Sequence, residues 1–112
     1  MKDKTVLIID DCAEIVRSTA RKLRQYWGVE TATTVGEALA KIPVAHVILS
    51  DWDMPEGGGA KILEVATVPV VIYTGGFRTE FMSKAAGFIE KPARTEDLDK
   101  ILFEALLAHK HT

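Results

Sequence analysis

Five polar residues stand out in this sequence because each lies at or just beyond the end of a short apolar run: Asp10, Asp11, Asp51, Thr74 and Lys91. Carboxylates that lie close together repel one another, and a hard divalent cation such as Mg²⁺ relieves the repulsion through oxygen ligands. A carboxylate can also attack phosphorus and form an aspartyl phosphate. Because phosphoryl transfer depends mainly on positioning and charge neutralisation, a lysine ammonium and a threonine hydroxyl are suitable companions.

The apolar runs that precede these residues have the character of buried strands. Val6–Ile9 is uninterrupted and largely β-branched, which is typical of a strand covered on both faces. The segment that follows has helical spacing, with Val16, Ala20, Leu23 and Trp27 at positions i, i+4, i+7 and i+11. We expect strands at residues 6–9, 29–33, 44–50, 70–73 and 88–90, and helices at 13–26, 34–42, 60–65 and 79–85 and from 95 onward.

Five strand–helix units in series predict an α/β fold, with a five-stranded parallel sheet covered by helices on both faces. The strand order 2-1-3-4-5 is taken over from flavodoxin-like proteins, in which this arrangement is common. In such sheets the functional site lies beyond the carboxyl ends of the strands, where the strand order reverses. The five polar residues are therefore expected to meet at one edge of the sheet.

The composition limits the classes of protein to consider. A chain of 112 residues, 47% of them hydrophobic, fits one compact domain spanning residues 1–112. A net charge of −2 gives no sign of direct nucleic-acid or membrane-surface binding. No apolar run is long enough for a membrane span, and the start does not have the pattern of a signal peptide. The single cysteine, Cys12, cannot form an internal disulfide, so we expect a cytoplasmic location.

At these residues the sequence resembles the receiver domain of response regulators in two-component signalling, and the resemblance covers the whole chain. Any one of the motifs that carry it is weak alone, but together, in order and at plausible spacing, they are a strong signal. They are Val-Leu-Ile-Ile-Asp-Asp at 6–11, Val-Ile-Leu-Ser-Asp-Trp-Asp-Met-Pro at 47–55, Val-Ile-Tyr-Thr-Gly at 71–75 and Gly-Phe-Ile-Glu-Lys-Pro at 87–92.

The resemblance implies that Asp51 accepts a phosphoryl group from the phosphohistidine of a histidine kinase or a phosphotransfer protein. It further implies Mg²⁺ as the cofactor, held by Asp10, Asp11, Asp51 and the backbone carbonyl of Asp53. Such a protein is a signalling phosphoacceptor that catalyses only its own phosphorylation and slow dephosphorylation. Asp53 lies two residues beyond Asp51, and its side chain is expected to change the lifetime of the phosphorylated state rather than its formation, by repelling or orienting the attacking water.

The same resemblance assigns the remaining residues of the site. Lys91 is expected to pair with the phosphoryl group, and Thr74 and Phe88 to be the switch residues that respond to it. The Lys91–Pro92 peptide is expected to be cis, a form that is inexpensive only before proline.

The last helix carries two apolar residues that its core face does not need. Its core face is formed by Leu98, Ile101, Leu102 and Ala105. Phe103 and Leu107 then point nearly the opposite way and neighbour each other on the helix surface. We expect them to form a face for a downstream protein or for a homodimer, since aromatic residues are enriched in interface cores.

The sequence departs from the family in two places and leaves two other functions open. The stretches from Asp51 to Thr74 and from Thr74 to Lys91 are short for the family, so the third and fourth helices are expected to be trimmed. One alternative function is a pseudo-receiver, a binding module that is not phosphorylated. The other is a phosphatase of the D-x-D type, suggested by Asp51 and Asp53. The chain is either a stand-alone regulator or a piece of a larger regulator or hybrid kinase.

Overall fold

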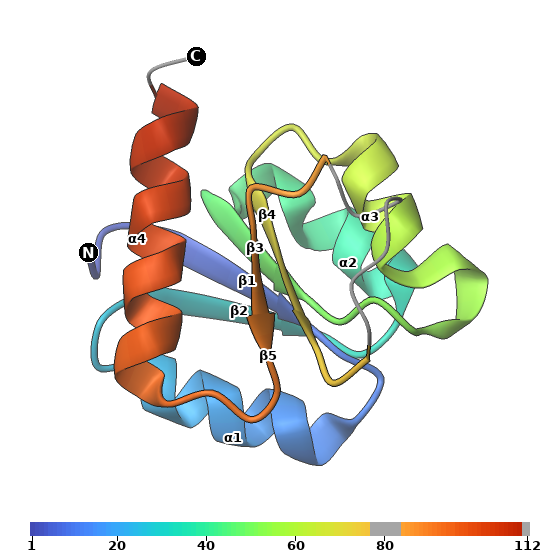
Figure 1. Cartoon of the computed structure of the whole chain (residues 1–112). Helices are drawn as coiled ribbons and strands as arrows, with labels where there is room; N and C mark the ends of the chain where they lie inside the picture. The colour runs from blue at the N-terminus through green and yellow to red at the C-terminus, as the bar shows by residue number, and fades with distance from the viewer. Residues whose placement is uncertain (77–83, 111–112) are drawn as a thin grey trace.

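The computed structural model describes residues 1–76 and 84–110. In these ranges all neighbouring strands are parallel and run in the order β2-β1-β3-β4-β5 (Figure 1). This confirms the predicted five-stranded sheet of order 2-1-3-4-5. The strands are β1 (Thr5–Ile9), β2 (Gly28–Ala32), β3 (Val47–Ser50), β4 (Val70–Thr74) and β5 (Gly87–Glu90), and the α-helices are α1 (Ala13–Leu23), α2 (Val35–Lys41), α3 (Gly58–Val65) and α4 (Thr95–Lys110).

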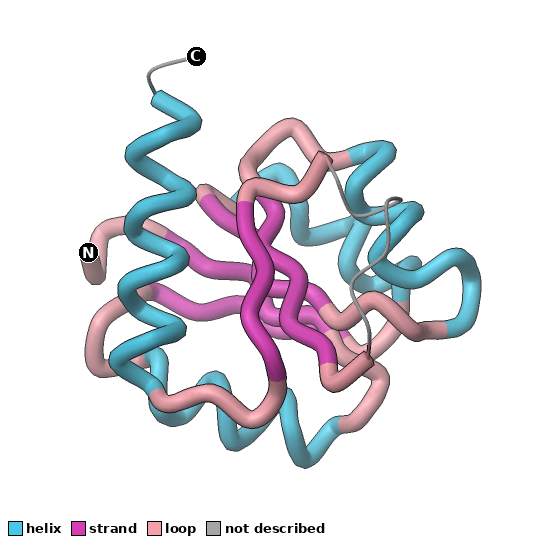
Figure 2. Tube along the Cα trace, in the orientation of Figure 1, coloured by secondary structure: helices cyan, strands magenta, loops and turns pink. Residues whose placement is uncertain are grey.

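Helices cover both faces of the sheet, with α1 and α4 on one side and α2 and α3 on the other (Figures 1 and 2). The side chains of β1 alternate between the two layers. Val6 and Ile8 pack against the α1 and α4 layer, and Leu7 and Ile9 pack against the α2 and α3 layer. Because both faces are covered, the strand is apolar and buried from Val6 to Ile9, as its sequence indicated.

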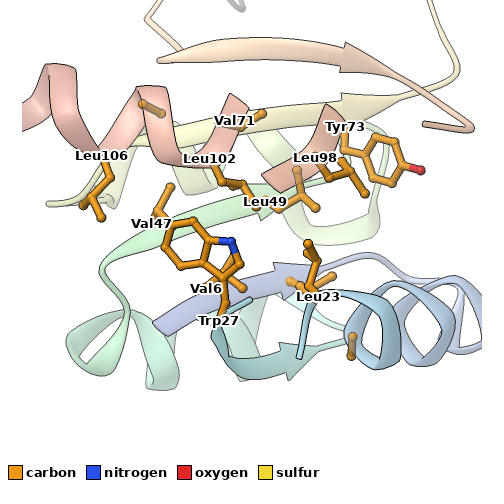
Figure 3. Packing of buried hydrophobic residues seen from close by; sticks show 13 residues of the cluster. Val6, Leu23, Trp27, Val47, Leu49, Val71, Tyr73, Leu98, Leu102 and Leu106 are labelled. Carbon is orange, nitrogen blue, oxygen red and sulfur yellow. The ribbon is translucent and has the colours of Figure 1, made fainter. Parts of the chain in front are cut away.

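Trp27, in the connection from α1 to β2, lies at the centre of the core layer under α4 (Figure 3). Its indole Nε1–H donates a 2.9 Å hydrogen bond to Oδ1 of Asp99 on α4. A buried indole N–H needs such a partner, and here the partner lies 72 residues away in sequence. This bond joins the connection between α1 and β2 to the last helix.

The orientation of α4 about its axis follows the prediction. Leu98, Leu102 and Ala105 are buried and Ile101 is partly buried. Phe103 and Leu107 are 39% and 38% exposed, and so lie on the outer side of the helix. Among the described residues no helix combines the length and the apolar character needed to cross a membrane.

The boundaries of several elements differ from those expected. β3 begins at Val47 rather than at residue 44, because Ile42–Val44 form a 3₁₀ turn around Pro43, which has no N–H to give to a sheet. The first helix ends at Leu23, whose carbonyl accepts the N–H groups of both Tyr26 and Trp27 in a tight turn. The third helix is short, with eight residues. Of the helix expected at residues 79–85, positions 79–83 lie outside the described residues.

Candidate functional site

The polar residues that follow the strands are held in place by backbone hydrogen bonds that extend the sheet past the strand ends. The N–H of Asp10 donates to the carbonyl of Ala32, and the N–H of Asp51 donates to the carbonyl of Ile9. At the other side of the sheet, the N–H of Lys91 donates to the carbonyl of Thr74 at 3.1 Å. The residues are therefore fixed in register at the carboxyl edge of four strands, as the sequence predicted.

Three carboxylates meet at this edge. One oxygen from each of Asp10, Asp11 and Asp51 lies within 4.8 Å of the others. Asp10 and Asp51 are buried, while Asp11 is exposed. Oδ1 of Asp10 also accepts the N–H of Cys12 at 2.9 Å, at the start of α1. The Cys12 side chain makes no capping hydrogen bond of its own, so Asp10 orders the beginning of this helix as well as the site.

Lys91 supplies positive charge to the cluster. Its Nζ lies 2.5 Å from Oδ2 of Asp10 and 3.6 Å from Oδ1 of Asp51. Burial alone would lower the pKa of the Lys91 ammonium, but the hydrogen bond to Asp10 and the charges of Asp10 and Asp51 raise the pKa above its ordinary value. The Lys91–Pro92 peptide is cis, as predicted.

Burial is the main reason that the pKa of the Asp51 carboxyl lies above its ordinary value. The charge of Lys91 opposes this shift, and so does the N–H of Trp52, which donates to Oδ1 of Asp51 at 2.8 Å. The negative charges of Asp10 and Asp11 add to the shift. The carboxylate of Asp51 is thus held in one orientation, in a cluster where the carboxylates outnumber the single ammonium of Lys91.

The donor set suits a hard divalent cation. Three carboxylates face one ammonium, so the cluster has excess negative charge, and all of its donors are the oxygens that Mg²⁺ prefers. One side chain of the cluster is exposed, which leaves room for the water that Mg²⁺ usually retains. Asp10, Asp11 and Asp51 therefore fit the metal that the sequence analysis expected.

Thr74 and Asp53 both lie close to Gly76, near the same edge. Thr74 Oγ1 accepts the N–H of Gly76 at 3.3 Å. A Cβ placed on Gly76 would lie 3.8 Å from Thr74 Oγ1 and 3.7 Å from Oδ2 of Asp53. The exposed carboxylate of Asp53 and the buried hydroxyl of Thr74 therefore both lie beside Gly76, although the two residues are far apart in sequence.

The other predicted residues do not belong to the acidic cluster. Phe88, in β5, is partly buried and packs against the layer formed by α2 and α3. It pairs with Ile72, two residues before Thr74 in β4, so it lies on the strand next to that of Thr74. Phe103 and Leu107 lie on the outer side of α4.

Sequence reasoning missed two features of the site. One is the turn that leads into the first residue of α3, where Glu56, Gly57 and Gly58 all have positive φ. A Cβ on Gly58 would lie 2.3 Å from the carbonyl oxygen of Trp52, so only glycine lets the turn approach the backbone beside Asp51 so closely. The run of glycines at 57–59 was the available signal. The other is Tyr73, whose ring lies under the Lys91 ammonium with 5.6 Å between Nζ and the ring centroid, whereas the sequence pattern indicates only a strand residue.

The fold and the site define a doubly wound α/β protein with a carboxylate cluster at the point where its strand order reverses. Compared by sequence, the chain matches no family model and no curated protein. Solved structures do match it. A CheY-like response regulator receiver domain protein from Methanospirillum hungatei JF-1 is 30% identical, with a TM-score of 0.85 over 96% of this chain and 97% of that one.

Two further structures agree. Chemotaxis protein CheY4 of Vibrio cholerae is 28% identical, with a TM-score of 0.82 over 91% of this chain and 98% of that one. The N-terminal domain of a response regulator/sensory box/GGDEF protein from Carboxydothermus hydrogenoformans is 27% identical, with a TM-score of 0.83 over 96% of this chain and 98% of that one. The chain belongs to the receiver domains of response regulators.

Proposed function

We propose that residues 1–112 form a phosphoacceptor domain in which Asp51 takes a phosphoryl group from the phosphohistidine of a histidine kinase or a phosphotransfer protein. The observation that carries the proposal is the meeting of three carboxylates within 4.8 Å, with Lys91 bound to one of them. The match to receiver domains supports the same role. We place the protein in the cytoplasm, where its proposed donors would reach it.

In the proposed reaction, a carboxylate oxygen of Asp51 attacks phosphorus while the bond from phosphorus to the histidine nitrogen breaks. The imidazole leaves with the electron pair of that bond and can take up a proton. The N–H of Trp52 holds Oδ1 of Asp51, which limits rotation of the carboxylate. Lys91 Nζ, 3.6 Å from that oxygen, can pair with a phosphoryl oxygen after transfer.

Mg²⁺ held by Asp10, Asp11, Asp51 and the backbone carbonyl of Asp53 would neutralise the negative charge on the phosphoryl oxygens. This chain catalyses its own phosphorylation in the proposal, and does not turn over a free substrate. Steady hydrolysis of a phosphomonoester would point instead to a D-x-D phosphatase that uses Asp51 and Asp53.

The new charge on Asp51 would be sensed by residues beside it. The Thr74 hydroxyl can rotate from the N–H of Gly76 to donate to a phosphoryl oxygen. Phe88 lies on the adjoining strand and would respond by shifting the population of its side-chain positions. The exposed pair Phe103 and Leu107 on α4 is the proposed face for a downstream protein or a second copy.

The test of the proposal is intact-mass measurement after incubation with acetyl phosphate. One added phosphoryl group is expected with Mg²⁺ and none without it. Asp51→Asn should abolish the adduct, whereas Asp3→Asn, a matched change at an exposed position, should not. A wild-type protein that takes no phosphoryl group would favour a pseudo-receiver, and an adduct on Asp51→Asn would refute the assignment of the acceptor.

A further inference from the structure

The last two residues of β4 hold the chain on both sides of Pro92. The carbonyl of Thr74 accepts the N–H of Lys91, and the phenolic oxygen of Tyr73 accepts the N–H of Ala93 at 3.1 Å. Pro92 has no N–H of its own. The two bonds therefore fix the backbone on both sides of the proline. One of the two residues fixed in this way is Lys91 itself.

The aromatic ring of Tyr73 lies beneath the charge of Lys91. The Nζ atom is 5.6 Å from the ring centroid, within the range in which the negative face of an aromatic ring attracts a cation. Tyr73 is 8% exposed, and the Lys91 side chain is 18% exposed. Cation–π attraction is stronger where water is excluded, so this contact is stronger than a surface one.

Tyr73 is also anchored firmly enough to act as a reference point. Its ring belongs to the core layer under α4, together with Leu98 and Leu102 (Figure 3). On its other side it lines a groove of about 290 Å³, whose walls include Ile15, Lys91 and Pro92. The ring thus stands between the packed core and the ammonium, and a smaller side chain would leave Lys91 without a wall.

We propose that Tyr73 is a positioning residue for Lys91, with separate tasks for its hydroxyl and its ring. The hydroxyl holds the backbone at Ala93, and the ring keeps the ammonium over the site while it exchanges Asp10 for a phosphoryl oxygen on Asp51. This inference rests on the proposed function of Asp51 and Lys91. A tyrosine that only filled the core would affect stability without any link to Lys91.

The test compares Tyr73→Phe, which removes the hydroxyl alone, with Tyr73→Leu, which removes the ring as well. We expect the rate of phosphorylation by acetyl phosphate to fall about five-fold in the first variant and about thirty-fold in the second, as the loss of one hydrogen bond and then of a cation–π contact implies. The matched control is Tyr26→Phe, because Tyr26 is the other tyrosine of the chain and packs against the same core layer. Its rate should equal that of the wild type.

A double-mutant cycle separates positioning from general destabilisation. In a Lys91→Met background, both substitutions at Tyr73 should change the remaining rate less than about two-fold, since the residue that they act through is absent. Equal effects in the two backgrounds would overturn the inference, and so would a Tyr73→Phe variant with the wild-type rate. Thermal melts show whether each variant is folded at the assay temperature.

A second measurement does not depend on phosphorylation. In proton NMR spectra, the methylene protons next to Nζ of Lys91 should carry a ring-current shift that Tyr73→Leu abolishes and Tyr26→Phe preserves. The amide proton of Ala93 should exchange with solvent faster in Tyr73→Phe. If the wild type fails to accept a phosphoryl group, the proposed function fails and these spectra still decide the position of Lys91. Unchanged spectra would refute the inference about Tyr73 itself.

Discussion

Lys91 occupies an oxygen that a metal ion at this site would need. Oδ1 of Asp10 accepts the N–H of Cys12, and Oδ2 accepts Nζ of Lys91 at 2.5 Å. A cation that binds Asp10 through Oδ2 therefore competes with the ammonium, because the two positive charges repel each other at the same oxygen. We predict that Lys91→Met binds Mg²⁺ more tightly than the wild type, although it accepts a phosphoryl group more slowly.

The size of the effect follows from the bond that is broken. A hydrogen bond to a charged group contributes about 1.5 to 3 kcal/mol. The displaced ammonium keeps part of that attraction, because Asp51 Oδ1 is only 3.6 Å from Lys91 Nζ. Taking the lower end, the gain in binding free energy for Mg²⁺ is about 1.5 kcal/mol, which is about a ten-fold decrease in the dissociation constant. The accumulated carboxylate charge acts in the same direction.

Isothermal titration calorimetry at constant ionic strength measures this change directly. The control is Lys100→Met, which removes the same charge from an exposed position on α4 and should leave the dissociation constant within about two-fold of the wild type, since exposed charges are screened by salt. Equal or weaker Mg²⁺ binding by Lys91→Met would show that Lys91 does not compete with the metal for Asp10.

Three further predictions concern other parts of the chain. Asp53→Ala should slow decay of the phosphorylated state by at least about three-fold and leave its formation unchanged, because a carboxylate beside the site can orient attacking water. Equal decay rates of the variant and the wild type, measured by intact mass, would show that the side chain has no part in the decay. The double change Phe103→Glu and Leu107→Glu should leave the fold and the phosphorylation rate unchanged. It should weaken self-association, measured by sedimentation, or partner binding, measured by pull-down, by at least about ten-fold. Unchanged association would refute the proposed interaction face. His46→Ala should lower the free energy of unfolding, measured in urea, by about 1 to 2 kcal/mol, because Nδ1 of His46 accepts the N–H of Thr5 at 3.0 Å. His46→Asn should recover most of the loss, since its side-chain oxygen can accept the same N–H. No recovery would contradict the hydrogen-bond explanation.

The sheet and the place of the site could be predicted because both depend on local patterns. An uninterrupted apolar run that stops at an acidic residue marks the carboxyl end of a buried strand, and parallel strands end at one edge. Asp10 and Asp51 are found there, each bonded by its N–H to the carbonyl of a neighbouring strand residue. The boundary at β3 failed because Val44 and Val47 are equally apolar, and only the turn around Pro43 separates them.

The contacts of Lys91 could not be predicted in the same way. Its partner Asp10 lies 81 residues away, and the choice between Asp10 and Asp51 depends on side-chain rotamers that no sequence pattern records. Tyr73 is a similar case. An aromatic residue near the end of a buried strand is expected to belong to the core, which it does. That its hydroxyl reaches Ala93 and its ring faces an ammonium follows only from the arrangement of β4 and β5.

These contacts make the acidic cluster a coupled unit. One carboxylate, that of Asp10, orders the start of α1 through one oxygen and holds Lys91 through the other. Binding of the metal ion and retention of Lys91 on Asp10 therefore oppose each other by the same free energy, since coupling between two binding events is reciprocal. A change that loosens Lys91, whether at Lys91 or at Tyr73, should tighten Mg²⁺ binding while it slows transfer to Asp51. Loss of a core contact alone would not raise the Mg²⁺ affinity while lowering the rate of transfer to Asp51. Opposite changes in these two quantities therefore distinguish a positioning residue from one that only stabilises the core.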